Sequence, residues 1–127
     1  MPGVSENTRL RLGHAGEELA ADHLVRQGFR ILDRNYRTLW GELDLVAFDG
    51  RALVFCEVKS RTTPPRYGTP FDAVHSAKRG QVRKMARAWL ADRPHHPFAS
   101  TIRFDAIGVL FDRSERLLAL EHLEGAF

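Results

Sequence analysis

The stretch of sequence that decides the fold is GELDLVAFDGRALVFCEVKSR, residues 41–61. Two runs rich in branched and aromatic residues, 42–48 and 51–59, flank Asp49-Gly50, a strong signal for a two-residue hairpin turn. Side chains alternate between the two faces of a strand, and here both alternating sets contain large apolar residues. A sheet that is apolar on both sides is covered on both sides, so the hairpin is predicted to lie centrally in an α/β domain.

Charged side chains gather at the end of this hairpin that lies away from the turn. A two-residue turn sets a register in which Asp44 faces Phe55 and Glu42 faces Glu57. Cross-strand partners point to the same side of a sheet, so Asp44, Glu57 and Lys59 are predicted to share one face, with Glu42 beside them. Carboxylates that lie so close together repel one another unless a cation compensates them.

Three interpretations of this cluster are open from the residues alone. In the plainest one, Lys59 forms an ion pair with Glu57 or Asp44 at the margin of the sheet. In the second, Asp44 and Glu57 hold Mg²⁺ or Mn²⁺ through hard oxygen ligands, and Lys59 positions an attacking water. The third makes Glu42 and Glu57 an acid/base pair acting on a sugar. It ranks lowest, because no aromatic platform accompanies the two acids.

The rest of the chain supplies helices and strands around the hairpin. Gly28 is expected to end the first helix, and Gly80 to interrupt the second. The predicted elements are a helix over 8–27, a strand over 29–37, the hairpin, a proline-containing loop over 64–70, a helix over 71–91, and strands over 101–111 and 116–123. A helix between the third and fourth strands favours a right-handed parallel crossover. We therefore expect a mixed sheet of four to five strands flanked by helices.

Composition limits the class of protein. The chain has 127 residues, of which 43% are hydrophobic and 28% are charged, as in an ordinary globular domain. We expect a single domain over residues 1–127, with residues 1–7 flexible. The single cysteine, Cys56, excludes an internal disulfide, and alternation places it in the core as an inert thiol. The N-terminus lacks an apolar signal segment and no apolar run is long enough to span a membrane, so a soluble cytoplasmic protein is expected.

Positive charge is concentrated in one part of the chain. The formal net charge is only +3, yet residues 59–87 contain eight basic side chains and one acidic one. Such an asymmetry suggests a positive face that attracts a polyanion such as nucleic acid, although a solvated helix surface would look the same. The residues chosen as phosphate contacts are Arg61, Lys78, Arg79 and Arg83.

The spacing of Asp44 and the tripeptide Glu57-Val58-Lys59 resembles the D-(x)n-E-x-K signature of the PD-(D/E)XK nuclease superfamily. Other segments of the sequence are more specific than this short signature. The segments GHAGEELAADHL, RNYR, GELDLVA, FCEVKSR, PFDAVHSAKR and RFDAIGV, in that order, resemble the bacterial YraN-like family of uncharacterised proteins over nearly the whole chain. That family is similar to archaeal Holliday junction resolvases, which are metal-dependent endonucleases.

The resemblance implies a restriction-endonuclease-like core and roles for particular residues. By position, Asp44 and Glu57 match the strand carboxylates that hold Mg²⁺ or Mn²⁺, together with the backbone carbonyl of Val58. Lys59 matches the catalytic lysine, and Glu17 matches the helix-borne acid that supports the metal site.

The resemblance also implies a function. It predicts hydrolysis of phosphodiester bonds in DNA, including branched recombination or repair structures, by a protein that forms a homodimer. Glu42 matches the acid of the family's GE(I/L)DL text, and its role is open. The alternative is a non-catalytic nucleic-acid-binding module that retains the nuclease fold. A purely structural protein partner is a third candidate.

Overall fold

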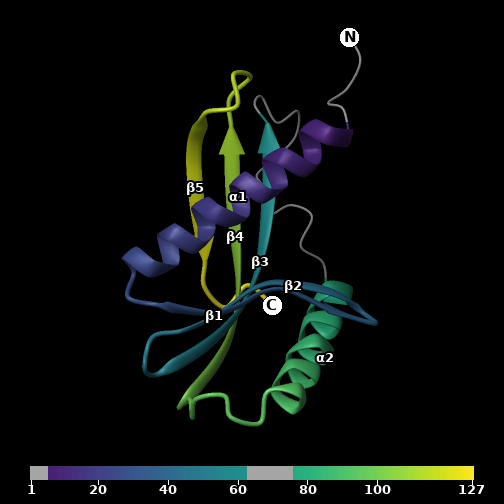
Figure 1. Cartoon of the computed structure of the whole chain (residues 1–127), viewed down its shortest axis with the longest axis vertical. Helices are drawn as coiled ribbons and strands as arrows, with labels where there is room; N and C mark the ends of the chain where they lie inside the picture. The colour runs from purple at the N-terminus through teal and green to yellow at the C-terminus, as the bar shows by residue number, and fades with distance from the viewer. Residues whose placement is uncertain (1–5, 63–75) are drawn as a thin grey trace.

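The chain folds around one five-stranded sheet, which the computed structural model describes for residues 6–62 and 76–127, without the side chains of 76–79. The elements are α1 (Glu6–Arg26), β1 (Arg30–Thr38), β2 (Gly41–Phe48), β3 (Ala52–Thr62), α2 (Ser76–Asp92), β4 (Thr101–Phe111) and β5 (Leu117–Leu123). The strand order follows the chain from β1 to β5, and only β3 and β4 run parallel (Figure 1). The predicted parallel crossover and mixed sheet are confirmed.

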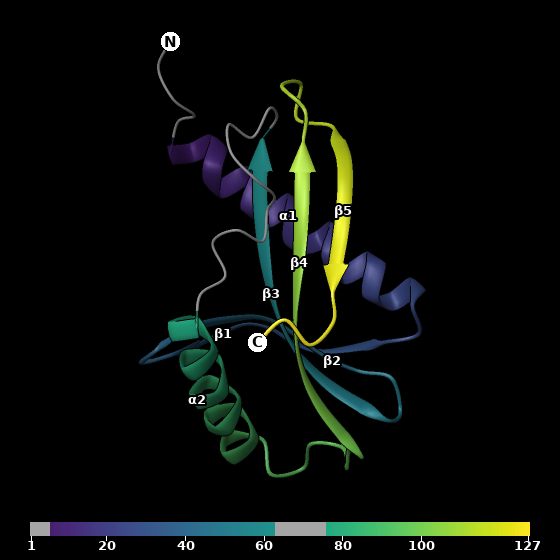
Figure 2. The same ribbon diagram turned by 180° about the vertical axis from the view of Figure 1, so that it is seen from behind.

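The two helices cover opposite faces of the sheet. α1 crosses in front of β3, β4 and β5 in Figure 1 and behind them in Figure 2. Its buried residues pack with Leu45, Val54 and Cys56. On the other face α2 packs against Val46 and Phe55. This arrangement confirms the expectation of an apolar hairpin covered on both sides, and it is consistent with a restriction-endonuclease-like core.

Two glycines were predicted to end or interrupt the helices, and only the prediction for α1 is correct. Gly28 has a φ of 94°, and the Phe29 N–H donates to the Leu24 carbonyl at 2.9 Å, so α1 ends on glycine as predicted. The break expected at Gly80 is wrong, because α2 runs unbroken through it. A glycine costs a helix only about 1 kcal/mol, which the burial of residues such as Met85 outweighs.

Some predictions fall on residues that the structure does not describe. The loop over 64–70 and the first part of the helix predicted from residue 71 lie outside the described residues. The same holds for residues 1–5 of the segment predicted to be flexible, whereas Glu6 and Asn7 already belong to α1. Neither α1 nor α2 has the length and apolar character needed to cross a membrane.

The register of the β2–β3 hairpin differs by two residues from the predicted one. Pairing runs from Phe48 with Leu53 to Leu45 with Cys56. The turn is longer than expected because the Asp49 Oδ1 accepts hydrogen bonds from the N–H of Ala52, at 2.7 Å, and of the residue before it. A shift of two residues equals the strand period, so it leaves the face of each side chain unchanged.

Alternation along β2 breaks near the predicted cluster. Leu43 packs in the layer of α2 together with Val46, whereas Leu45 packs in the layer of α1. On the neighbouring strand, Asn35 lies opposite Asp44 in the register and has a φ of 52°, which is unusual for a strand residue. The strict alternation predicted for this strand is therefore wrong here, and the irregularity turns Asp44 toward Glu17 of α1. The prediction that Asp44 shares one face with Glu57 and Lys59 is wrong for the same reason. Cys56 and Val58 pack in the layer of α1, so Glu57 between them points to the other side.

α1 lies close to β3 at Gly16. A Cβ atom added to Gly16 would lie 2.0 Å from the Ser60 Oγ and 3.3 Å from the Ser60 Cβ. Contacts this short are rare for real Cβ atoms, so a side chain at this position would have to displace the Ser60 hydroxyl or move the helix away from the strand. The close approach also carries Glu17, the next residue along α1, to the sheet.

We expect Gly16→Val to lower the free energy of unfolding by about 2 kcal/mol, because its side chain must displace the Ser60 hydroxyl or push α1 away from β3. Urea unfolding followed by circular dichroism measures the change. Gly13→Val is the matched control, since a Cβ at Gly13 of the same helix would meet nothing within 4 Å. Equal losses in the two variants would contradict the close contact between Gly16 and Ser60.

Candidate metal centre

Three carboxylates from two elements converge beside the hairpin. Glu17 of α1 and Glu42 and Asp44 of β2 each offer one oxygen atom, and these atoms all lie within 4.8 Å of one another. Glu42 and Asp44 both come from the stretch of β2 where alternation breaks, and both reach the acid of α1. The structure thus brings together two of the predicted site residues, Glu17 and Asp44, and adds Glu42, whose role the sequence had left open.

Asp44 occupies the point where the pairing of β2 with β3 ends. Its Oδ2 accepts a hydrogen bond of 2.7 Å from the N–H of Val58, which lies two residues beyond Cys56, the last residue of β3 that pairs with β2. The pKa of Asp44 is raised to about 7, mainly by burial. The hydrogen bond from the Val58 N–H opposes the rise, and the charges of Glu17, Glu57 and Glu42 add to it. At neutral pH a large share of Asp44 therefore carries a proton, because burial and the neighbouring acids disfavour its charged form.

Glu17 is perturbed in the same direction. Burial raises its pKa first, and the charge of Glu42 adds to the effect, while nearby His14 and a hydrogen bond from Asn35 lower it. Two of the three converging acids thus bind protons more tightly than usual. A divalent cation among them would supply the missing charge, and half-buried carboxylate oxygens are the ligands that Mg²⁺ and Mn²⁺ prefer.

Glu57 and Lys59 of β3 form an ion pair next to this group. The Glu57 Oε1 lies 3.5 Å from the Lys59 Nζ, and 13% of the Glu57 side chain is exposed. Glu57 is not one of the three converging acids, although its charge contributes to the raised pKa of Asp44. The plain ion-pair interpretation therefore describes Glu57 and Lys59, but it does not account for the three acids.

Val58 also meets the cluster through its backbone. Its N–H points to Asp44, and the N–H and C=O of one strand residue point to the same edge. The carbonyl of Val58, which the resemblance implied as a metal ligand, therefore faces the side of β3 on which Asp44 lies.

Asn35 of β1 is a site residue that the sequence reasoning missed. With its NH₂ group turned toward the acids, it donates to the Glu42 Oε1 at 2.7 Å and to the Glu17 Oε2 at 2.9 Å. One amide thus links the acid of α1 to an acid of β2. The only signal in the sequence was an asparagine within a strand, since this residue tolerates a positive φ better than most.

The residues chosen as phosphate contacts have different surroundings. Arg61 is exposed and follows Lys59 by two positions on β3. Arg83 donates to the carbonyl of Phe127 at 3.3 Å and lies 4.7 Å from the centre of the Phe104 ring, so it packs against the C-terminus. Lys78 and Arg79 belong to α2, but their side chains lie outside the described part of the chain.

A second buried acid, Asp105 of β4, has a structural environment. It is fully buried, and its carboxylate receives two hydrogen bonds of 2.9 Å from Arg103, one of 2.7 Å from His122 and one of 3.0 Å from the Gly125 N–H. Burial raises the pKa of Asp105, but the hydrogen bonds from His122 and Arg103 outweigh it and hold the pKa below its usual value. Its oxygens are occupied by protein donors, so we assign Asp105 to the packing of β4 and β5.

The mixed sheet with a helix on each face, the acids on its central hairpin and the Glu57-Val58-Lys59 tripeptide together define a protein of the PD-(D/E)XK nuclease-like class. Within that class the chain belongs to the UPF0102 family, also called the YraN family. Residues 16–109 match the family model described as "Uncharacterised protein family UPF0102".

Relatives in this family match the chain along nearly its full length. A UPF0102 protein of Renibacterium salmoninarum is 51% identical, over 93% of this chain and 97% of the relative. One from Frankia casuarinae is 47% identical over 91% and 95%, and one from Pelotomaculum thermopropionicum is 44% identical over 95% and 98%. The resemblance inferred from the short motifs is therefore confirmed at the level of the family.

Proposed function

We propose that the protein is a metal-dependent endonuclease that hydrolyses phosphodiester bonds in DNA, including branched structures, and that it acts as a homodimer. The observation that carries the proposal is the convergence of oxygens from Glu17, Glu42 and Asp44 within 4.8 Å. The Glu57–Lys59 pair at 3.5 Å adds a cation next to this group. Oxygen ligands beside a lysine match the needs of phosphoryl chemistry, in which charge develops on the phosphate.

The residues fit a hard divalent cation such as Mg²⁺ or Mn²⁺. Glu17, Glu42 and Asp44 would hold it, with Glu57 and the carbonyl of Val58 as further ligands from β3. A bound ion of this kind lowers the pKa of a coordinated water and stabilises the charge that develops on the phosphate.

The protein's own side chains prepare this centre. The Val58 N–H holds the Oδ2 of Asp44, which leaves the other carboxylate oxygen available for the cation. Asp44 has a pKa of about 7, and a cation held by these carboxylates would favour its deprotonated form. The Lys59 ammonium would orient the attacking water and offset the negative charge of the phosphate.

Incubation of the purified protein with end-labelled DNA tests the proposal. Linear, flapped and four-way substrates are incubated with Mg²⁺, with Mn²⁺ or with EDTA, and the products are separated on denaturing gels. We expect new fragments from at least one substrate with a divalent cation and none with EDTA. Protein that binds these DNAs but leaves all of them intact with both ions would overturn the proposal.

The competing function is a non-catalytic nucleic-acid-binding module. The observation in its favour is that Lys59 already pairs with Glu57, as it would in a purely structural patch. Both functions predict binding that weakens as salt rises, because phosphate counterions compete with the protein. Only the endonuclease predicts a cleaved product, and the absence of binding even at low salt would argue against both.

A further inference from the structure

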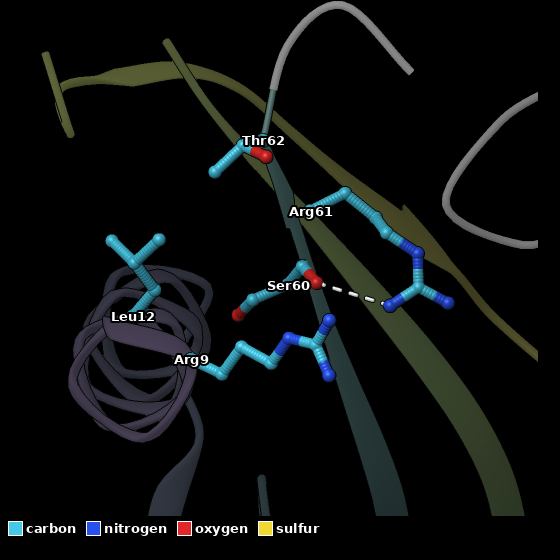
Figure 3. Close-up of a pocket in the computed structure, with 5 residues that line it drawn as sticks. All are labelled: Arg9, Leu12, Ser60, Arg61 and Thr62. Carbon is cyan, nitrogen blue, oxygen red and sulfur yellow. Dashed lines mark hydrogen bonds between the residues drawn. The ribbon is translucent and has the colours of Figure 1, made fainter. Parts of the chain in front are cut away.

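A pocket of about 450 Å³ lies where the end of β3 meets α1. It is lined by Arg9, Leu12, Ser60, Arg61 and Thr62, and Figure 3 shows these side chains. Among the described residues its lining thus offers two guanidinium groups and two hydroxyls, with no carboxylate. We propose that this pocket binds a phosphate group of the nucleic acid whose cleavage is proposed above, and the inference rests on that function.

The backbone of β3 supplies donors to the pocket. Pairing with β2 ends at Cys56, whereas pairing with β4 continues to Thr62. Within the described ranges, the other edge of β3 therefore has no strand neighbour beyond Cys56. The Val58 N–H points to this edge, and the alternation of hydrogen-bonding directions along a strand turns the N–H of Ser60 and Thr62 the same way. Backbone N–H groups of this kind are common phosphate ligands in protein–DNA complexes.

The two arginines bring positive charge to the same place. Arg9 reaches from α1 toward β3, with its guanidinium beside Ser60 in the view of Figure 3. Arg61 donates only to the carbonyl of Ser60, at 3.1 Å, and neither arginine forms an ion pair within the described residues. Arg9 also lies near the N-terminal end of α1, where the helix dipole disfavours a cation. A bound phosphate would offset all of this positive potential.

The distance from the proposed metal centre suits a nucleic-acid strand. Arg9 precedes Glu17 by a little over two helical turns, or about 12 Å along α1. Thr62 lies about 10 Å beyond Lys59 along β3. Phosphates of one DNA strand advance about 3.4 Å per nucleotide along the duplex axis. A strand whose reacting phosphate lies at the metal centre would thus bring a nearby phosphate of the same strand to the pocket.

Salt-dependent DNA binding in EDTA tests the pocket without requiring catalysis. We expect Arg9→Ala and Arg61→Ala each to weaken binding and to reduce the slope of log K against log salt by about 0.9, and the double variant by about twice that. Arg26→Ala is the matched control, because Arg26 is an exposed arginine at the opposite end of α1. It should change neither value. Parental affinity and slope in the double variant would overturn the proposal.

Two further comparisons define the ligand and separate this inference from the nuclease proposal. Oligonucleotides with and without a 5′-phosphate distinguish the sources of the phosphate. A loss in the double variant that is equal for both supports a backbone phosphate, and a loss confined to the phosphorylated one supports a terminal phosphate. The affinity for Mn²⁺, measured by isothermal titration calorimetry, should be the same in the double variant as in the parent. If the parent binds no Mn²⁺ and cuts nothing while the pocket variants still lose DNA affinity, the nuclease proposal fails and the pocket stands.

Discussion

Replacing Asp44 with asparagine is expected to abolish metal-dependent cleavage, to leave DNA binding intact and to make the metal-free protein more stable at pH 8. Cleavage is lost because a neutral amide is a poor ligand for a hard cation. Stability increases because a buried charge surrounded by other acids is removed, while the amide oxygen still accepts the hydrogen bond from the Val58 N–H. Asp44, which supports the proposed chemistry, therefore lowers the stability of the metal-free protein when its carboxylate is charged.

The stability effect of Asp44 depends on pH in a defined direction. Its pKa rises from 3.8 to about 7 on folding, so the folded protein holds the proton more tightly than the unfolded chain. The parent is therefore most stable, with respect to this group, below pH 4, and it loses that contribution as the pH rises to about 7. Each pKa unit corresponds to about 1.4 kcal/mol, so the advantage of Asp44→Asn at pH 8 is expected to be about 2 to 4 kcal/mol.

Urea unfolding in EDTA at pH 4 and at pH 8 measures this difference. The advantage of the asparagine variant should be present at pH 8 and nearly absent at pH 4. Glu18→Gln is a suitable control, because Glu18 is an exposed acid next to Glu17 that pairs with Arg34 instead of joining the cluster. An asparagine variant that is less stable than the parent at pH 8 would contradict the view that the charged form of Asp44 destabilises the folded protein.

Replacing Asn35 is expected to weaken Mn²⁺ binding about 10- to 100-fold, because its amide orients both Glu17 and Glu42. Asn35→Ala and Asn35→Gly both remove the amide, so both should lose affinity in isothermal titration calorimetry. They differ in the backbone, since glycine accepts the φ of 52° and alanine does not. The glycine variant should therefore be the more stable of the two, by about 1 kcal/mol.

Arg34→Ala serves as the control for this experiment. Arg34 is the neighbour of Asn35 on β1, but it pairs with Glu18, outside the three acids. Its replacement should leave the affinity for Mn²⁺ unchanged. Parental affinity in both Asn35 variants would show that the amide does not position the acids.

The elements of the fold could be predicted because they depend on local patterns. Apolar spacing identified α1 and both strands of the hairpin, and Gly28 marked the end of the first helix. Registers and breaks were harder to predict. The turn after β2 is lengthened by a side-chain hydrogen bond of Asp49, and α2 passes through Gly80 because its packing outweighs local preference.

The residues of the candidate site were likewise predictable from the sequence only in part. The predicted hairpin brought Asp44 near Glu57-Val58-Lys59, which the hydrogen bond from the Val58 N–H to Asp44 bears out, and motif resemblance pointed to Glu17. Neither could reveal that Glu42 joins the group or that Asn35 bridges it. Those contacts depend on a positive φ in β1 and on a broken alternation in β2, and both arise only when strands and helix pack together.

The sequence by itself determined the type of fold, the family and the presence of acids beside a lysine on the central hairpin, because these follow from short-range periodicity and motif spacing. Only the tertiary structure decided which acids meet. Gly16 lets α1 lie against Ser60 of β3, and this contact carries Glu17 across the fold to oxygens of β2. The physical reason is that close packing between distant segments depends on the full shape of both surfaces, which no local pattern specifies.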